Sequence, residues 1–297
     1  MNGVLIVNKP KAFTSFDVVA VVRRLSGQRK IGHTGTLDPN ATGVLPLLLG
    51  NATKAQDIVP NHDKSYIAEF RLGITTDTLD IWGEVKTECE SHITRRQIEA
   101  LIPDFTGKIE QIPPMYSAVY HNGQRLYDLA RQGIEVERKA RNVTVYELKL
   151  LSFDESTQSG TLTVSCSKGT YIRTIIDDIG AKLGVGAVMT ALDRTAACGY
   201  TKADSLTLDE LKQLAENGGL ESKLMSTESL FSVYPELVVS DAQAKRFYNG
   251  GALDTARTAL SKANPADGAI FRVKDRSGKF LGLGIICDTI INIYKHF

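Results

Sequence analysis

The sequence has few cysteines, and they form no closely spaced pair. Its 297 residues include Cys89, Cys166, Cys198 and Cys287, and none of them belongs to a C-x-x-C motif. Zinc ribbons and small disulfide frameworks depend on closely or regularly spaced cysteines. We therefore expect reduced thiols in a cytoplasmic protein with no metal site.

Long apolar segments are also missing. The N-terminal run "VLIV" has four residues, and the later run "VLPLLLG" is interrupted by proline. A membrane-spanning helix needs about 20 apolar residues, and the apolar core of a signal peptide needs about 7–15. We expect no targeting segment and no membrane partner.

A large net charge is absent, but the charges are unevenly distributed. The formal charge is +1, with seven Lys or Arg against three Asp or Glu in residues 1–60. Residues 61–231 have 19 against 25, and residues 232–297 have nine against six. The two basic ends indicate an anionic ligand that both ends contact, with chance variation in surface charge as the alternative.

Strand and helix patterns are mixed along the chain without a regular βαβ alternation. Period-two alternation predicts half-buried strands at 65–72 and 160–166, and "GVLIVN" at 3–8 is a further β-rich run. Capping residues and apolar spacing predict helices at 14–27, 94–102, 171–184 and 207–219. This pattern favours an α+β fold with a mainly antiparallel sheet flanked by helices.

The last sixty residues differ in texture from the rest. A short amphipathic helix is predicted near 240–251, followed by "GAIFRVKD", the turn "RSGK" and "FLGLGIICD", a pattern typical of a β-hairpin. We place a domain boundary after Pro235. The prediction is a large domain of residues 1–235 and a small β domain of residues 236–297.

The segment "GHTGTLDPNATG" at 32–43 is the most unusual stretch of the chain. It lacks the G-x-x-x-x-G-K-[ST] spacing of a phosphate-binding loop, and His33 and Asp38 have no further metal ligands at set spacings. Asp-Pro is also a favoured start of a type I turn, so Asp38 taken alone is explained by a simple turn. From these residues alone the simple turn is the better interpretation, and a loop that presents one carboxylate stays open.

The same segment resembles the signature loop of the TruB family of tRNA pseudouridine synthases, G-H-x-G-x-L-D-P-x-A-x-G-x-L-P. The matching positions are Gly32, His33, Gly35, Leu37, Asp38, Pro39, Ala41, Gly43, Leu45 and Pro46. Four further stretches are similar in the family's order: "NKPKAFTS", "KSYIAEFRLGITTDTLDIWG", "PPMYSAVYHNGQRLYDLAR" and "SKGTYIRTIIDDIG", the last followed by "LDRT". The C-terminal residues resemble, more weakly, the PUA-type RNA-binding domain. Ala12 and Tyr120 depart from the family pattern, which usually has glycine and lysine there.

The resemblance implies a pseudouridine-synthase fold and the isomerisation of uridine 55 in the T-loop of tRNA. No cofactor is implied. Asp38 is the implied catalyst, Arg173 its ionic partner, and Tyr66 the residue that lies against the target base. The sequence leaves open whether Asp38 attacks the base, attacks the sugar or abstracts a proton. The alternatives from the residues alone are an Arg173–Asp177 pair on one helix and a core position for Tyr66.

The target uridine has to be flipped out of its stack, and the resemblance implies that His33 fills the vacated space. Residues expected to bind substrate also include Gly32, Thr34, Gly35 and Leu192. Lys9, with the nearby basic residues 29 and 30, is expected to meet phosphates.

Two other functions stay open at this point. The first is a non-catalytic tRNA-binding or folding factor with the same surface, and the second is a metal-free hydrolase that uses Asp38. The intact set of Asp38, Tyr66 and Arg173 disfavours a pure binder, which needs no carboxylate facing an anionic ligand. We expect tRNA as partner, a monomer, and no obligate protein partner.

Overall fold

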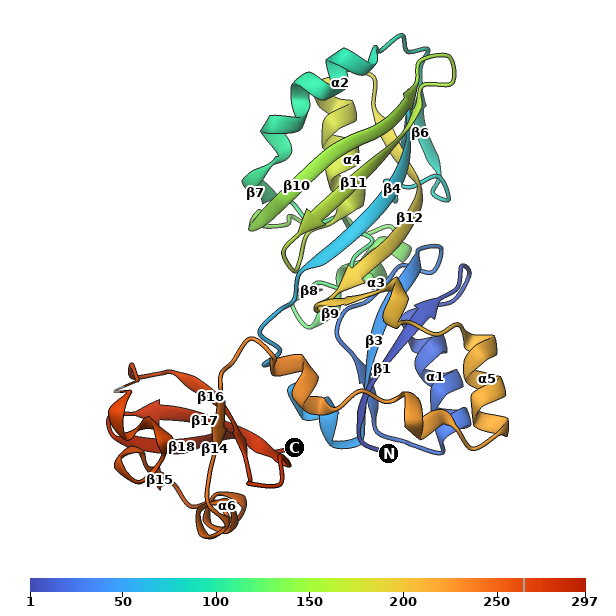
Figure 1. Cartoon of the computed structure of the whole chain (residues 1–297). Helices are drawn as coiled ribbons and strands as arrows, with labels where there is room; N and C mark the ends of the chain where they lie inside the picture. The colour runs from blue at the N-terminus through green and yellow to red at the C-terminus, as the bar shows by residue number, and fades with distance from the viewer. Residues whose placement is uncertain (264) are drawn as a thin grey trace.

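The computed structural model describes residues 1–263 and 265–297 and contains two main β-sheets (Figure 1). The larger sheet has nine strands, in the order β1-β3-β12-β4-β11-β10-β7, with β2 beside β3 and β13 beside β12. Every strand pair in it is antiparallel except β3 with β12. Its strands are β1 (Gly3–Lys9), β2 (Ile31–His33), β3 (Thr42–Leu49), β4 (Lys64–Leu72), β7 (Gly107–Gln111), β10 (Arg141–Asp154), β11 (Ser159–Cys166), β12 (Ala187–Ala197) and β13 (Tyr200–Thr201).

The remaining elements surround this sheet or belong to the C-terminal part. Two small hairpins are β5 (Ile74–Thr76) with β6 (Val85–Glu88) and β8 (Tyr120–His121) with β9 (Gln124–Arg125). The helices are α1 (Ser15–Ser26), α2 (Arg95–Leu101), α3 (Leu126–Arg131), α4 (Ile172–Lys182), α5 (Leu208–Glu216) and α6 (Asp241–Tyr248). Short 3-10 helices are η1 (Gly50–Ala55), η2 (Ile102–Phe105), η3 (Lys202–Asp204), η4 (Leu220–Lys223), η5 (Thr227–Phe231), η6 (Thr255–Arg257) and η7 (Ala259–Lys262). The predicted mixed fold with a mainly antiparallel sheet is confirmed.

Helix α1 begins and ends where the sequence predicts. Thr14 and Asp17 form a reciprocal capping box, in which each side chain binds the other residue's backbone N–H. Gly27 follows the helix in the left-handed conformation, with φ of 64°, which glycine adopts at little cost. The apolar face of α1 packs with α5 against one side of β1 and β3. These two helices and β1, β2 and β3 make up what we call the N-terminal lobe.

Strand β4 has the predicted alternation. Tyr66, Ala68, Phe70 and Leu72 are buried, and the residues between them are more exposed. The buried side chains contact α2 and α4, which cover the same face of the sheet. Fully burying a large apolar side chain contributes about 1.5–3 kcal/mol, so this face stabilises the second part of the sheet. We call β4, β7, β10, β11 and β12 with α2 and α4 the central lobe.

The two lobes are joined where β3 runs parallel to β12. Gly43 of β3 lies opposite Arg194 of β12, and a Cβ atom at Gly43 would come within 2.2 Å of the Arg194 carbonyl oxygen. Its φ of 106° is also unfavourable for other residues. The seam between the lobes therefore requires glycine at this position.

A separate C-terminal β domain follows. Its sheet has the order β14-β16-β17-β18-β15 and contains the predicted hairpin of β16 and β17. The strands are β14 (Glu236–Val238), β15 (Leu253–Asp254), β16 (Ile270–Lys274), β17 (Phe280–Cys287) and β18 (Ile290–Lys295). Phe280, Leu283 and Phe297 pack with Phe231 against the side of β1 and β3 that faces away from α1. Packing at this junction, not only the chain connection, attaches the domain.

The turn before α1 is formed without the usual glycine. Ala12 adopts φ of 64° and is exposed. Changing Ala12→Gly should raise the free energy of unfolding by about 0.5–1 kcal/mol, because a left-handed non-glycine residue costs about 1–2 kcal/mol and the greater freedom of unfolded glycine offsets part of the gain. Urea unfolding measures this. Ala20→Gly, at an exposed helical position, is the control and should destabilise the protein; a destabilised Ala12→Gly variant would contradict the prediction.

Candidate active site

The loop between β2 and β3 contains the turn that the Asp-Pro step predicts, but its carboxylate is not used to form the turn. The backbone N–H of Ala41 donates to the carbonyl of Asp38 at 3.1 Å. The buried Ser15 hydroxyl at the start of α1 binds the N–H of Leu37 at 2.9 Å. The backbone of the loop is thus fixed at both sides of Asp38, and its side chain is free to contact other groups.

Arg194, to which the sequence assigned no role of its own, also binds this loop. Its side chain is fully buried and donates to the carbonyls of Val44 at 2.7 Å, Gly35 at 3.1 Å and Thr36 at 3.4 Å. Each hydrogen bond to a charged group contributes about 1.5–3 kcal/mol. These hydrogen bonds join segments about 150 residues apart, and no local pattern around the arginine of "LDRT" predicts them.

The expectation that Lys9 meets phosphates is wrong. Lys9 is fully buried, and its Nζ donates to the carbonyls of Phe13 at 2.5 Å, Pro10 at 3.0 Å and Pro39 at 3.0 Å. Burial lowers the pKa of Lys9 to about 8, an effect that the nearby Asp38 partly offsets. Lys9 is therefore a structural residue that ties the β1–α1 turn to the Asp38 loop.

Asp38 forms an ion pair with Arg173, which lies at the start of α4. Nε of Arg173 is 3.0 Å from Oδ2 of Asp38, and the arginine is only 5% exposed. Its other nitrogens donate to the carbonyls of Thr78 at 2.8 Å and Tyr116 at 2.9 Å. Three different segments therefore fix this guanidinium. Among the described residues, Arg173 does not pair with Asp177, so the alternative of a local pair on one helix is wrong.

Asp80 is a second carboxylate near Arg173. Its Oδ2 lies 4.0 Å from a terminal nitrogen of Arg173, and Thr78 donates a hydrogen bond to its other oxygen. Burial raises the pKa of Asp80 above its usual value, and the Thr78 hydrogen bond and Arg173 oppose that effect. The sequence pattern around "TLDIWG" assigned no role to Asp80.

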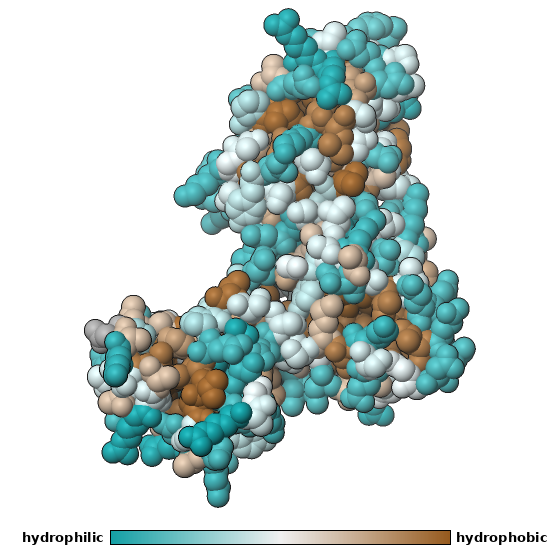
Figure 2. All heavy atoms as spheres, viewed as in Figure 1, coloured by the Kyte–Doolittle hydropathy of each residue, from teal (hydrophilic) through white to brown (hydrophobic). Residues whose placement is uncertain are grey.

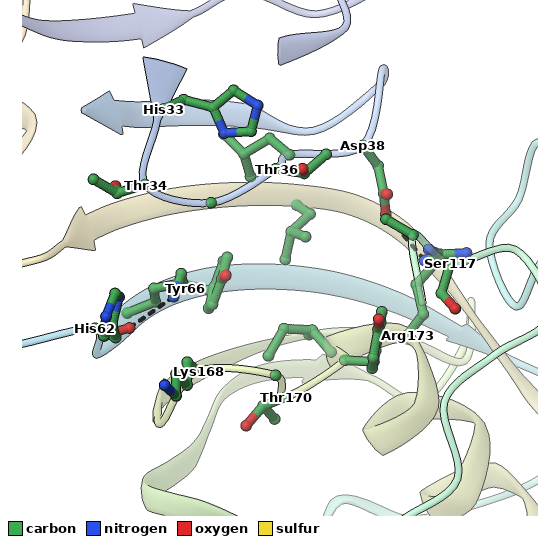
Figure 3. A pocket seen from close by; sticks show the side chains of 18 of the residues that line it. His33, Thr34, Thr36, Asp38, His62, Tyr66, Ser117, Lys168, Thr170 and Arg173 are labelled. Atoms are coloured by element: carbon green, nitrogen blue, oxygen red, sulfur yellow. Dashed lines mark hydrogen bonds and ion pairs between the residues drawn. The ribbon is translucent and has the colours of Figure 1, made fainter. Parts of the chain in front are cut away.

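A cavity of about 480 Å³ opens beside the Asp38–Arg173 pair. Such a volume is within the usual range of small-molecule sites, about 300–1,000 Å³. Figure 3 shows His33, Thr34, Thr36 and Asp38 on one side of it and Tyr66, Lys168, Thr170 and Arg173 on the other. Seven of the residues that the sequence predicts for the site do line this cavity: His33, Thr34, Gly35, Asp38, Tyr66, Arg173 and Leu192.

Gly32 and Lys9 do not line this cavity. Gly32 lies in β2 opposite Leu48, where a Cβ would come within 2.8 Å of the side-chain oxygen of Gln56. The structure adds polar residues that the sequence did not point to, among them Lys64, His62, Ser117 and Lys168. Most of them come from segments between strands, whose positions depend on the sheet.

Burial sets the protonation of the aromatic groups in the cavity. It raises the pKa of Tyr66 to about 12, so this phenol is neutral at pH 7. Burial, with a smaller effect of Arg194, lowers the pKa of His33, which is therefore neutral at pH 7. The His33 ring meets Phe16 edge to face at a centroid distance of 5.6 Å. Burial and Arg194 also lower the pKa of Lys64, which donates to the His62 carbonyl at 2.7 Å.

Metal-binding clusters and membrane-spanning helices are both absent from the described part of the chain. Within residues 1–263 and 265–297, no three His, Cys, Asp or Glu side chains are grouped as a metal would require. None of the helices in these residues is long and apolar enough to cross a membrane.

Comparison with known sequences places this loop and cavity in a family. Residues 23–172 match the family described as TruB family pseudouridylate synthase (N terminal domain), and residues 173–232 match the tRNA pseudouridylate synthase B C-terminal domain. The chain belongs to the TruB family. A relative named tRNA pseudouridine synthase B from Clostridium perfringens is 44% identical over 285 residues, which is 96% of this chain and 95% of the relative. A TruB relative of the same name from Geobacillus thermodenitrificans is 46% identical over 259 residues, 85% of this chain and 86% of the relative.

Solved structures agree with the TruB assignment at the level of fold. A chain in the "Crystal Structure of a Cbf5-Nop10-Gar1 Complex" superimposes with a TM-score of 0.74 at 24% identity, covering 99% of this chain and 84% of that chain. A chain from "Structure of H/ACA RNP bound to a substrate RNA containing 2'-deoxyuridine" gives 0.73 at 22% identity, with the same coverage. The predicted family and fold are confirmed.

The structural role of Lys9 is testable by unfolding. Lys9→Met keeps the length of the side chain but leaves buried carbonyls without a donor, so we expect the free energy of unfolding to fall by about 2–4 kcal/mol. Lys30→Met, at an exposed lysine of the same lobe, should change it by less than about 0.5 kcal/mol. Equal stability of the Lys9→Met variant and the wild type in urea would contradict this role.

Proposed function

We propose that this TruB-family chain isomerises a uridine in the T-loop of tRNA, position 55, to pseudouridine. The observation that carries the proposal is Asp38, oriented by the buried Arg173 at the wall of a nucleotide-sized cavity. The relatives' shared name, tRNA pseudouridine synthase B, supports the substrate class.

The reaction breaks the bond between N1 of uracil and C1′ of the ribose, rotates the base, and joins C5 to C1′. The proton on C5 is lost and N1 gains one, so no electrons or groups are exchanged with a second substrate. A carboxylate serves this chemistry as a nucleophile or as a base. The Arg173 guanidinium forms an ion pair with the Asp38 carboxylate and so orients it toward the cavity.

The other cavity residues suit a flipped pyrimidine. Tyr66 is neutral at pH 7, so its ring offers an apolar face and an O–H donor to the detached base. The neutral His33 projects from the opposite side, beside flexible glycines, where it can take the place of the extruded nucleotide. Leu192 completes the apolar wall and helps to keep water from the intermediate.

A protein that only binds tRNA would not need this arrangement. A carboxylate repels RNA phosphates, and a buried arginine that orients it costs desolvation. Neither feature improves binding. The catalytic proposal explains both, and no observation favours the non-catalytic alternative.

We further propose a domain boundary at 235/236 and an RNA-binding, PUA-like role for residues 236–297. The C-terminal domain lies to the side of the lobes, and a broad concavity separates it from the central lobe (Figure 2). Its exposed basic residues include Lys245 on α6, Arg276 and Lys279. These observations support a second contact with the tRNA outside the cavity.

We also propose that the chain acts as a cytoplasmic monomer without cofactor, metal or obligate protein partner. The reaction exchanges no electrons or groups with a second substrate, which supports the absence of a cofactor; the monomer and the cytoplasmic location stay predictions from the sequence.

Asp38→Asn is the direct test of catalysis. An amide cannot act as nucleophile or base, so we expect the rate to fall at least about 10³-fold, with tRNA affinity equal or higher because a negative charge is removed. Mass spectrometry of carbodiimide-treated T-arm RNA measures the product, and binding of labelled tRNA measures affinity.

The matched control is Asp57→Asn, which changes another carboxylate that lines the same cavity but forms no ion pair within the described residues. It should retain most of the activity. An Asp38→Asn variant with a tenth or more of the wild-type rate would remove Asp38 from the mechanism.

The role of the C-terminal domain is testable through salt dependence. Replacing Lys245 and Lys279 with Ala should weaken tRNA binding and flatten its logarithmic salt dependence by up to about 0.9 for each phosphate that is no longer neutralised. The rate at saturating tRNA should not change. The control replaces Lys212 and Lys223, two exposed lysines near α5, and should leave the slope unchanged. Equal slopes for both double variants would contradict the proposal.

A further inference from the structure

The only tryptophan of the chain is exposed beside the active site. Trp82 has 42% of its surface accessible, and the Nζ atom of Lys11 lies 5.2 Å from the centroid of its ring. Single exposed apolar residues are common and need no explanation. A partly exposed indole with an ammonium over its face is a more specific arrangement, since the same pair of groups binds a nucleobase and its phosphate.

Both residues belong to segments that contact the Asp38–Arg173 pair. Lys11 follows Lys9, whose ammonium binds the carbonyl of Pro39. On the other side, the backbone N–H of Trp82 donates at 3.2 Å to the Asp80 carboxylate, which lies 4.0 Å from Arg173. The Lys11–Trp82 contact therefore connects the N-terminal lobe to the β5–β6 turn, at the end of the cavity where Asp38 lies.

The turn that carries Trp82 is held in one conformation. The N–H of Ile81 donates to the carbonyl of Met189 at 2.9 Å, and a Cβ at Gly83 would lie 2.2 Å from the Thr78 hydroxyl. An aromatic side chain on a fixed turn loses little conformational freedom when it binds a ligand. The backbone that carries the indole is thus positioned before the RNA arrives, and Lys11 contacts the ring.

The charges around Trp82 decide which part of a nucleotide faces it. Asp77, Asp80 and Glu84 lie on the same turn and would repel a phosphate. Lys11, on the opposite lobe, is exposed and attracts one. A bound nucleotide therefore places its base against the indole and its phosphate toward Lys11.

We propose that Trp82 stacks on the base of an unpaired nucleotide adjacent to the flipped uridine, and that Lys11 binds that nucleotide's phosphate. The inference rests on the proposed function and adds an RNA contact outside the uridine cavity. Trp82 is a substrate-positioning residue in this account, and it takes no part in bond breaking.

Because Trp82 is the sole tryptophan, its intrinsic fluorescence reports on this contact alone. The protein is titrated with a T-arm stem-loop RNA in an Asp38→Asn background, so that the RNA stays unmodified. We expect a saturable decrease in fluorescence and protection of the indole from acrylamide. A fully paired RNA of equal length should produce neither effect. Unchanged fluorescence and acrylamide quenching at saturating stem-loop RNA, with saturation measured by anisotropy of labelled RNA, would overturn the proposal.

Variants with Asp38 intact separate stacking from structure. Trp82→Ala should weaken binding of the stem-loop about five- to 150-fold, the effect of removing one base–aromatic stack, while Trp82→Phe retains most of the affinity. For both variants, the rate at saturating RNA should stay within about twofold of the wild-type rate. Their midpoints of thermal unfolding should match that of the wild type. Lys11→Ala should reduce the logarithmic salt slope by about one.

The outcomes distinguish this inference from the proposed function. Wild-type protein that forms pseudouridine in the stem-loop, together with Trp82→Ala that binds as tightly as wild type, overturns only the Trp82 contact. Wild-type protein that binds the stem-loop without forming pseudouridine contradicts the proposed function instead. Leu151→Ala, at an apolar residue on β10 with 52% exposure, is the control for simple removal of exposed apolar surface and should leave affinity unchanged.

Discussion

Two buried cations determine the shape of the loop that presents Asp38. Arg194 binds the carbonyls of Gly35 and Thr36 before the aspartate, and Lys9 binds the carbonyl of Pro39 after it. With these carbonyls directed toward the cations, the loop backbone is held on both sides of the carboxylate. Each hydrogen bond to a charged group contributes about 1.5–3 kcal/mol, enough to offset much of the cost of burying the two charges. The seam between the lobes, the shape of the loop and the position of Asp38 all depend on this arrangement.

The same cations help to explain how a carboxylate works next to an anionic substrate. Arg173 forms an ion pair with Asp38, and the buried Lys9 lies close enough for the Asp38 charge to raise its pKa against the effect of burial. Buried charges are screened by salt much less than exposed ones. These buried cations therefore oppose the repulsion between the Asp38 carboxylate and RNA phosphates, even though the chain as a whole has a formal charge of only +1.

The sequence predicts well what local interactions decide. The capping box of α1 and the alternation of β4 are local patterns, and the structure confirms both. The Asp38–Arg173 pair joins residues 135 positions apart, and without the family resemblance the local Arg173–Asp177 pair would be the better interpretation. The prediction for Lys9 is wrong because isolated lysines are mostly exposed, and nothing in "NKPK" indicates that three carbonyls surround its ammonium.

Contacts between distant segments also attach the C-terminal domain, and they fix its orientation. Arg272 of β16 lies 2.7 Å from Glu228 and also pairs with Glu236, and Phe297 at the chain end packs on Phe231. The arginine and Glu228 are mostly buried, so breaking this pair would leave a desolvated charge. A domain held by both ion pairs and aromatic packing is presented in one orientation relative to the cavity. Under the proposed RNA-binding role of this domain, two RNA contacts at a fixed separation would select RNA by shape as well as by charge, because an RNA of the wrong geometry could engage only one of them.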